Sequence, residues 1–182
     1  MRPSSPFLLA ALAVLPLTSA AAEEPDAIAA PGEIKALTLQ AVGAQIYECK
    51  ARAGGDLAWH FREPIATLLS DGKTVGRHYA GPNWEMSDGS AIVAKAVGRA
   101  SAASADDIPL LKLEVTSRHG SGQLAAIATI QRINTKGGVA TGPCESNGAF
   151  LAVPYTADYA FLRREQLSLE GSRHASALPP SE

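Results

Sequence analysis

The chain is poor in the residues that mark several large classes of protein. Aromatic residues make up only 5% of its 182 residues, which is few for a protein that holds large apolar ligands. Lys and Arg do not cluster, and the net charge is −2, so the basic face of a nucleic-acid-binding protein is absent. Beyond the N-terminal segment, no apolar run approaches the roughly 20 residues that span a bilayer. These absences predict no nucleic-acid partner and no transmembrane segment in the mature chain.

Motifs of the common cofactor and catalytic sites are missing as well. The four histidines show no H-x-H or H-E-x-x-H spacing, so no metal site is predicted, although strands could bring His60, His78 and His119 together. The G-x-S-x-G string of many serine hydrolases does not occur. A G-x-G-x-x-A string at residues 120–125 precedes a strand-like run, whereas a dinucleotide site needs a helix there. We expect a hairpin turn at this string and no cofactor.

The N-terminal segment has the features of a secretory signal peptide. Arg2 precedes an apolar run, and small residues follow at 18–22. The alternative is a membrane anchor, but the run is about nine residues long, less than half of what a spanning helix needs. We therefore expect residues 1–22 to be removed, with cleavage after Ala20 or Ala22. The mature protein is then exported, either to the periplasm or to the cell exterior.

The chain contains two cysteines, Cys49 and Cys144. In an exported protein an even number of cysteines favours a disulfide. The alternatives are a thiol nucleophile or a metal pair, but the two residues lack C-x-x-C spacing. Each also has an acidic neighbour, Glu48 or Glu145, which would raise the pKa of a thiol. We predict a structural disulfide between them.

The remaining roughly 160 residues fit one domain with its own core. Most segments between residues 34 and 168 alternate with the period of a β-strand, for example at 45–49, 58–62 and 124–133. Gly and Asp turn signals such as Asp88-Gly89 separate these segments. The pattern predicts an all-β, mainly antiparallel domain of about eight or more short strands, either a sandwich or a barrel. Residues 64–69 and 91–105 are also compatible with helix, so we expect at most one or two short helices.

Polar segments flank this domain on both sides. Residues 23–33 are acidic and contain Pro and Gly, and we expect a flexible entry segment there. Residues 169–182 combine serines with Pro179 and Pro180. Such a composition cannot bury enough apolar surface to order the chain, so we expect a disordered tail.

The densest group of polar and aromatic side chains lies at residues 76–90, G-R-H-Y-A-G-P-N-W-E-M-S-D-G-S. It combines aromatic rings that can stack on a sugar with groups that form hydrogen bonds. A second polar cluster, at residues 131–138, is typical of a turn, and its Gln131 and Arg132 should point to opposite faces of a strand. The candidate ligand-binding residues are His78, Tyr79, Trp84, Glu85, Asp88, Arg132 and Asn134.

Three functions are compatible with these residues. The leading hypothesis is a non-catalytic binding or envelope-associated module for a saccharide or small polar ligand, because no catalytic arrangement is complete. The alternative is a secreted hydrolase of a glycan or ester, in which Glu85 or Asp88 acts with His78. That alternative requires at least one acid with a raised pKa in a cleft. In the third interpretation Trp84 is a core aromatic and the cluster only supports the fold.

Several strings recur in the order seen in a known family. They are Y-E-C at 47–49, W-x-F at 59–61, G-x-H-Y-A-G-P-x-W-E at 76–85, D-G-S at 88–90, I-P at 108–109, Q-R-x-N-T-x-G-G at 131–138, and V-P-Y at 153–155. With them the chain resembles, from about Gly43 to Leu162, the secreted bacterial and fungal proteins catalogued as domain of unknown function 3455. That family has no established activity, so the resemblance implies which residues matter and not which reaction. Both cysteines belong to the pattern, which fits the disulfide.

Overall fold

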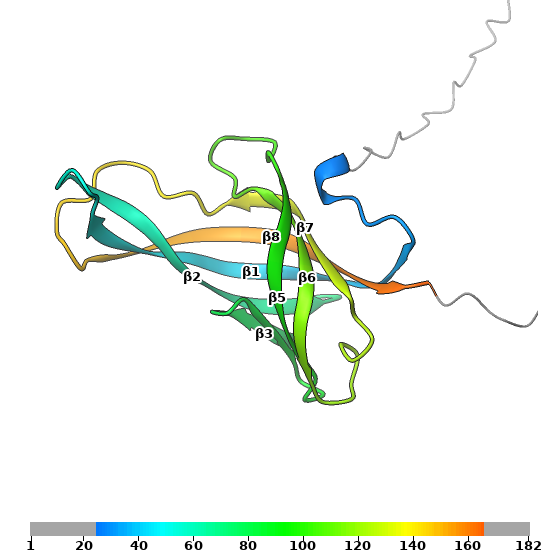
Figure 1. Cartoon of the computed structure of the whole chain (residues 1–182). Helices are drawn as coiled ribbons and strands as arrows, with labels where there is room; N and C mark the ends of the chain where they lie inside the picture. Colours follow the sequence, from blue (N-terminus) through cyan, green and yellow to red (C-terminus); the bar gives the residue numbers. More distant parts are fainter. Residues whose placement is uncertain (1–24, 166–182) are drawn as a thin grey trace, which may run out of the picture.

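The structure, a computed structural model, describes residues 25–165, which form one antiparallel β-sheet closed into a barrel (Figure 1). Each strand pairs with the next one along the chain, and the last strand returns to pair with the first. Of the two architectures that the sequence leaves open, the chain therefore adopts the closed one. The strands are β1 (Glu33–Ala51), β2 (Leu57–Ser70), β3 (Lys73–Tyr79), β4 (Asn83–Met86), β5 (Ala91–Ala100), β6 (Leu110–His119), β7 (Thr129–Gly137) and β8 (Phe150–Arg164).

Alternation along the strands fills the interior of the barrel. Leu39 of β1 and Tyr159 and Phe161 of β8 point inward and are at most 3% exposed. The connection between β6 and β7 adds Leu124 and Ile127, which are also buried. These side chains belong to one apolar cluster that includes residues from every strand except β3, whose partly buried Val75 packs against it. The core therefore lies inside the barrel, and side chains of alternate residues face outward.

The prediction of an all-β fold is confirmed, and both segments compatible with helix are strand. Residues 64–69 lie in β2, and most of 91–105 lies in β5. Within the described residues the one helical element is a short 3-10 turn, η1 (Asp26–Ile28). The strand expected from residue 124 begins only at Thr129. Before it the chain turns twice, since Ala125 N donates to Gly122 O (3.0 Å) and Ile127 N donates to Leu124 O (3.2 Å).

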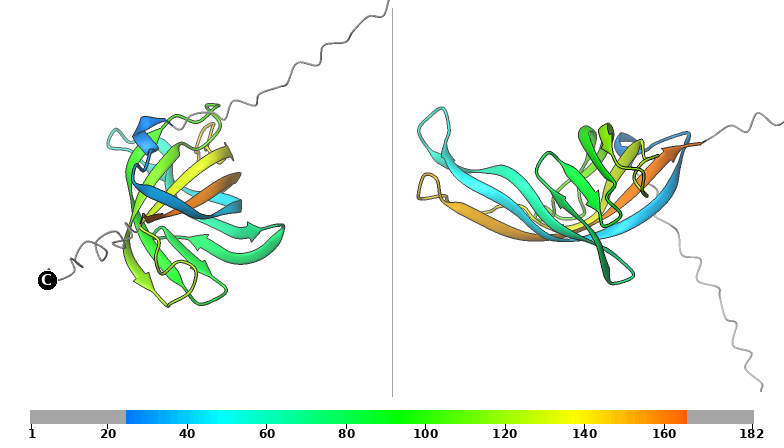
Figure 2. Two further views of the ribbon diagram at one scale, coloured as in Figure 1. Left: turned by 90° about the vertical axis from the view of Figure 1, so that its right-hand side faces the viewer. Right: turned by 90° about the horizontal axis from the view of Figure 1, so that it is seen from below.

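Three strands are longer than the short strands expected from the sequence. β1, β2 and β8 have 19, 14 and 15 residues, and they continue past the other strands as a curved arm (Figure 2). We define the arm as residues 45–51 of β1, 57–65 of β2 and 150–154 of β8, because in it β2 and β8 pair with β1 but not with β3 or β7. A bulge places one extra residue, Arg62, in β2 opposite the step from Ile46 to Tyr47.

The predicted disulfide is present and lies in the arm. It joins Cys49 of β1 to Cys144 of the loop between β7 and β8, with 5.7 Å between the two Cα atoms. Cys49 is fully buried. The bond therefore attaches a long loop to the part of the sheet that has the fewest neighbouring strands.

The η1 turn packs on the outside of the barrel against β5 and β6 (Figure 1). Ile28 is fully buried there, and its carbonyl oxygen accepts a hydrogen bond from Gln131 Nε2 (2.8 Å). A Cβ at Gly98 would overlap the Ala27 carbonyl oxygen, so this approach requires glycine. The contact falls within residues 23–33, whose flexibility stays a prediction. The predicted signal peptide (1–22) and tail (169–182) lie outside the described residues.

Candidate ligand-binding pocket

The string at residues 76–90 folds into a tight hairpin of β3 and β4. The turn is at residues 80–82, with a cis peptide bond between Gly81 and Pro82. In the hairpin His78 pairs with Trp84, and Arg77 pairs with Glu85. Because neighbouring positions on a strand face opposite sides, the first pair points into the barrel and the second points out. The cluster is therefore divided between two faces of the sheet.

His78 and Trp84 stack inside the barrel. Their ring centroids are 4.3 Å apart with an interplanar angle of 18°, and Tyr159 packs edge-on against both rings at 5.0 and 5.3 Å. Trp84 is fully buried and His78 is 3% exposed. Trp84 Nε1 has no hydrogen-bond partner within the described residues. The indole is thus a core side chain with a buried N–H donor that the fold leaves free.

The environment of His78 keeps its imidazole neutral. Burial lowers its pKa from 6.5 to about 4, and the positive charge of Arg132 acts in the same direction. Nδ1 lies 2.8 Å from the backbone oxygen of Asn83. Since a carbonyl oxygen can only accept, the hydrogen is on Nδ1, and Nε2 carries the lone pair. Any role of His78 at neutral pH is therefore that of a neutral ring.

Glu85 and Tyr79 lie on the outer face of the hairpin. The Glu85 carboxylate accepts from Arg77 Nη2 (2.9 and 3.0 Å), from Arg77 Nε (3.2 Å) and from the Tyr79 hydroxyl (2.9 Å). The hydrogen bonds from Arg77, and then that from Tyr79, hold the pKa of Glu85 below its usual range. The Arg77 guanidinium also lies over the Tyr79 ring, 5.0 Å from the centroid. This face is a surface ion-pair cluster that does not contact His78.

Asp88 joins two turns of the chain. Its Oδ1 accepts from Ser90 N (2.8 Å) and from the Ser90 hydroxyl (2.6 Å), and its Oδ2 accepts from Gln123 N (2.8 Å). The hydrogen bond from the Ser90 hydroxyl is the largest cause of a lowered pKa for Asp88, followed by that from Gln123 N. Asp88 therefore holds the β4–β5 turn against the β6–β7 connection. Neither acid has the raised pKa that a hydrolase would require.

A pocket of about 350 Å³ lies inside the barrel, next to the β3–β4 turn. Its wall includes Pro82 from that turn and Leu111 from β6, with Phe61 and Arg62 of the arm at its rim. Phe61 and Arg62 are neighbours that both reach the pocket, because the bulge in β2 interrupts the alternation there. Apolar groups supply most of this wall.

The floor of the pocket is polar. Gln45, His78, Trp84 and Tyr159 line it and are at most 3% exposed. Arg132 lines it too, and its charge affects the pKa values of His78 and Tyr159. Burial raises the pKa of the Tyr159 hydroxyl, and Arg132 opposes that shift only in part, so the phenol stays neutral. The pocket thus contains one half-buried cation among neutral polar groups.

The structure brings together three of the seven candidate residues. His78, Trp84 and Arg132 line the pocket, whereas Tyr79, Glu85, Asp88 and Asn134 do not. Asn134 lies in a bulge of β7 with a positive φ of 51°, and its Nδ2 donates to Asp158 Oδ2 (2.8 Å). As expected, Gln131 and Arg132 face opposite sides of β7, toward η1 and toward the pocket.

Sequence reasoning missed Gln45, Tyr159 and the apolar wall. Gln45 lies on the same face of β1 as the inward residues Leu39 and Ala41. A polar residue on an otherwise apolar face could have indicated a functional position. Tyr159 shares the inward face of β8 with Phe161. Nothing in the sequence indicated that these strands, far apart along the chain, would meet at one end of a barrel.

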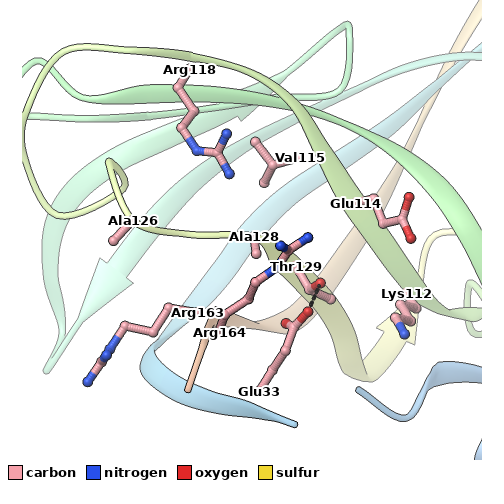
Figure 3. A pocket seen from close by; sticks show the side chains of 10 residues that line it. All are labelled: Glu33, Lys112, Glu114, Val115, Arg118, Ala126, Ala128, Thr129, Arg163 and Arg164. Atoms are coloured by element: carbon pink, nitrogen blue, oxygen red, sulfur yellow. Dashed lines mark hydrogen bonds between the residues drawn. The ribbon is translucent and has the colours of Figure 1, made fainter. Parts of the chain in front are cut away.

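A second, larger pocket of about 580 Å³ lies between the start of β1, the end of β8 and β6 (Figure 3). It is lined by charged groups, but several of them already bond to the fold. Lys112 Nζ donates to Ala29 O (2.9 Å), and Arg118 Nη2 donates to Ile127 O (2.6 Å). The Thr129 hydroxyl donates to Glu33 Oε1 (2.9 Å). We therefore place the candidate site in the barrel interior.

Among residues 25–165, no group of three or more His, Cys, Asp and Glu side chains is arranged to hold a metal ion. In the same part of the chain, no helix is long and apolar enough to cross a membrane.

Comparison with known proteins identifies one family. A family described as a protein of unknown function (DUF3455) matches residues 30–163. The searches of curated proteins and of solved structures found no significant match. The match covers all eight strands except Arg164, the last residue of β8, and it includes every residue of the pocket floor.

Proposed function

Because the chain belongs to the DUF3455 family, whose description gives no activity, we propose a function from the pocket itself. The protein is a non-catalytic binding module that holds a small polar ligand inside the barrel. The observation that carries this proposal is a 350 Å³ pocket with apolar walls, whose floor combines the half-buried Arg132 with neutral polar side chains. Trp84, whose ring lines this floor, also has a buried Nε1 without a partner among the described residues, and buried donors are nearly always satisfied in folded proteins.

The volume and lining fit a small ligand better than a saccharide. A pocket of this size is at the lower end of the range for small-molecule sites, which combine apolar walls with a few polar groups. The stacking platform expected for a sugar ring is not available. Trp84 is covered by His78 and Tyr159, and one face of Tyr79 is covered by Arg77. A small polar ligand is therefore the occupant we propose.

Binding without catalysis agrees with the positions of the acids. A hydrolase would need an acid near the pocket, with His78 as its partner. Glu85 is on the outer face and Asp88 is in a turn, each held by several hydrogen bonds. His78 has no serine or threonine among the residues that line its pocket. No observation favours the hydrolase over the binding module.

An exported location fits the same proposal. The Cys49–Cys144 disulfide is of the kind that persists in oxidising compartments, and it supports the interpretation of residues 1–22 as a signal peptide.

The binding proposal can be tested by NMR, because the chain has two tryptophans. Trp84 lies in the pocket floor, whereas Trp59 lies in the arm and does not line the pocket. In the ¹⁵N-labelled oxidised protein, a panel of small acids, amides, alcohols and amines should include ligands that shift the Trp84 indole N–H signal. The Trp59 signal should stay in place.

A blocked pocket provides the control. Ala96 lines the pocket and is exposed, so Ala96→Trp should fill the pocket without disturbing the buried core. Val97→Trp adds the same ring at the neighbouring exposed position, which does not line the pocket. We expect the ligand-induced shift to disappear in Ala96→Trp and to persist in Val97→Trp. If no compound moves the Trp84 signal, or if Ala96→Trp leaves the shift unchanged, the proposal is wrong.

A further inference from the structure

We propose that the ligand of this pocket is a small organic acid, whose single carboxylate binds Arg132 and whose apolar body lies against the pocket wall. This inference rests on the proposed binding function and names the chemical class that the site selects.

Arg132 is fixed in position but is not saturated. Its Nε and Nη2 both donate to the backbone oxygen of Pro109, at 3.0 and 2.9 Å. A guanidinium has five N–H donors in a planar fork, so these two bonds leave three donors, one of them beside the Tyr159 hydroxyl, whose pKa it lowers. The contact with Pro109 holds the plane of the group, and this reduces the entropy lost when a ligand binds.

The charge of Arg132 has no acidic partner in the described part of the chain. The four ion pairs found there are Lys50–Glu48, Arg62–Glu63, Arg77–Glu85 and Lys136–Asp107. No Asp or Glu lines the pocket. A partly buried cation without a counter-charge is unfavourable, so an anion that enters the pocket removes an existing cost.

The neighbouring groups of the floor can donate to the same anion. Trp84 Nε1–H is a donor that cannot accept, and it has no partner. Tyr159 lines the same floor, and its hydroxyl forms no hydrogen bond of good geometry among residues 25–165. This phenol keeps its hydrogen because burial raises its pKa. A carboxylate accepts only, and so it matches these donors, whereas the lone pair of His78 Nε2 offers it no hydrogen bond.

The apolar wall of the pocket and the single positive charge of Arg132 favour an organic acid over an inorganic anion. The wall contributed by Leu111, Leu113 and Pro82 offers nothing to a free phosphate, whose second charge would also remain uncompensated. The other arginine of the pocket, Arg62, is at the rim, where it pairs with Glu63 (3.2 Å) and lies over the Phe150 ring. The single half-buried cation, Arg132, therefore selects one carboxylate.

The first experiment uses the unmodified protein, so it does not depend on the folding of a variant. Benzoate and benzamide have the same shape and differ in charge. We expect benzoate to shift the Trp84 indole signal with at least tenfold higher affinity than benzamide, because a hydrogen bond to a charged group is stronger than one between neutral groups. Inorganic phosphate at the same ionic strength should not displace benzoate.

Arginine variants then show which residue causes the preference for benzoate over benzamide. Arg132→Gln should reduce benzoate affinity at least tenfold, to the level of benzamide. Arg132→Lys, which keeps the charge but loses the fork, should recover part of the preference for benzoate. Arg99→Gln is the matched control, because Arg99 is exposed on β5 and does not line the pocket, and it should leave the ratio of the two affinities within about threefold of the parent value.

The outcomes separate this inference from the proposed function. If neutral compounds shift the Trp84 signal and benzamide binds as tightly as benzoate, the pocket binds ligands but does not select acids, and the inference is overturned. It is also overturned if Arg132→Gln keeps the preference for benzoate, or if phosphate displaces benzoate. If no compound of any class shifts the signal, the binding function itself fails.

Discussion

His78 illustrates how burial changes the chemistry of a side chain that looks like a general base in the sequence. Its ring is stacked on Trp84 at 4.3 Å and bonded through Nδ1 to Asn83 O. With a pKa of about 4, it stays neutral over the physiological range. In the unfolded chain the imidazole has its ordinary pKa near 6.5. The residue therefore links stability to pH.

We expect His78→Gln to flatten the pH dependence of stability. Below pH 6.5 the unfolded chain binds a proton that the folded chain does not bind until about pH 4. The stability contributed by the neutral ring is thus complete above pH 6.5 and is lost as the pH falls to about 4. The loss is roughly 3 kcal/mol. Urea unfolding of parent and variant at pH 7, 5.5 and 4.5 measures it.

The matched control for that experiment is His60→Gln. His60 is exposed on β2, so its variant should keep the slope of the parent protein. A His78→Gln protein that loses stability as steeply as the parent between pH 6.5 and 4 would show that another group causes the slope.

At the scale of elements, the β3–β4 hairpin and the turn that follows it separate groups that are close in sequence. The hairpin sends His78 and Trp84 inward and Arg77 and Glu85 outward. The following turn is fixed by Asp88, which bonds to Ser90 and to Gln123 N from another connection. The polar part of the string therefore stabilises loops and the outer surface.

We expect Asp88→Ala to loosen both connections locally. Removal of the carboxylate leaves the amides of Ser90 and Gln123 without their acceptor, so their hydrogen exchange should accelerate at least tenfold. Amides of β1 and β8 should keep their protection. Asp56→Ala, in the turn between β1 and β2, serves as the control, because the Asp56 side chain forms no hydrogen bond within the described part of the chain. Unchanged exchange at both Ser90 and Gln123 would contradict the assigned role of Asp88.

These elements also show which structural features could be predicted from the sequence and which could not. Period-two alternation and Asp-Gly turns predicted the strands, because both are local patterns. The even cysteine count in a chain expected to be exported predicted the disulfide. The turn at Gly81-Pro82 was missed, since the string was interpreted as one cluster. Period-two alternation alone places Tyr79 and Glu85 on the face opposite His78 and Trp84, and grouping the whole string as one cluster overlooked this. Gln45 and Tyr159 joined the site through the closure of the barrel, which no local pattern encodes.

At the scale of the whole molecule, the disulfide connects the arm to the loop between β7 and β8. Cys49 and Cys144 are 95 residues apart, so the bond closes a loop that contains strands β2 to β7. In the chain-entropy view, such a cross-link mainly restricts the unfolded chain. Its contribution should therefore appear in the equilibrium stability of the whole protein.

We expect the Cys49→Ala, Cys144→Ala double variant to be less stable than the oxidised parent by up to about 4 to 5 kcal/mol. Denaturant unfolding of both proteins measures the difference, and the parent under reducing conditions should resemble the variant. Equal midpoints for the variant and the oxidised parent would show that the bond does not stabilise the fold.

The arm has one further consequence, which concerns other chains. Beyond the barrel the outer edges of β2 and β8 have no partner strand within residues 25–165, and exposed edges of this kind promote fibre growth by adding strands from neighbouring molecules. Each edge contains a proline, Pro64 or Pro154, which has no N–H to donate to a ladder. Arg62 and Glu63 add charges to the β2 edge. Proline and charge on these edges therefore disfavour the addition of strands from other copies of the protein.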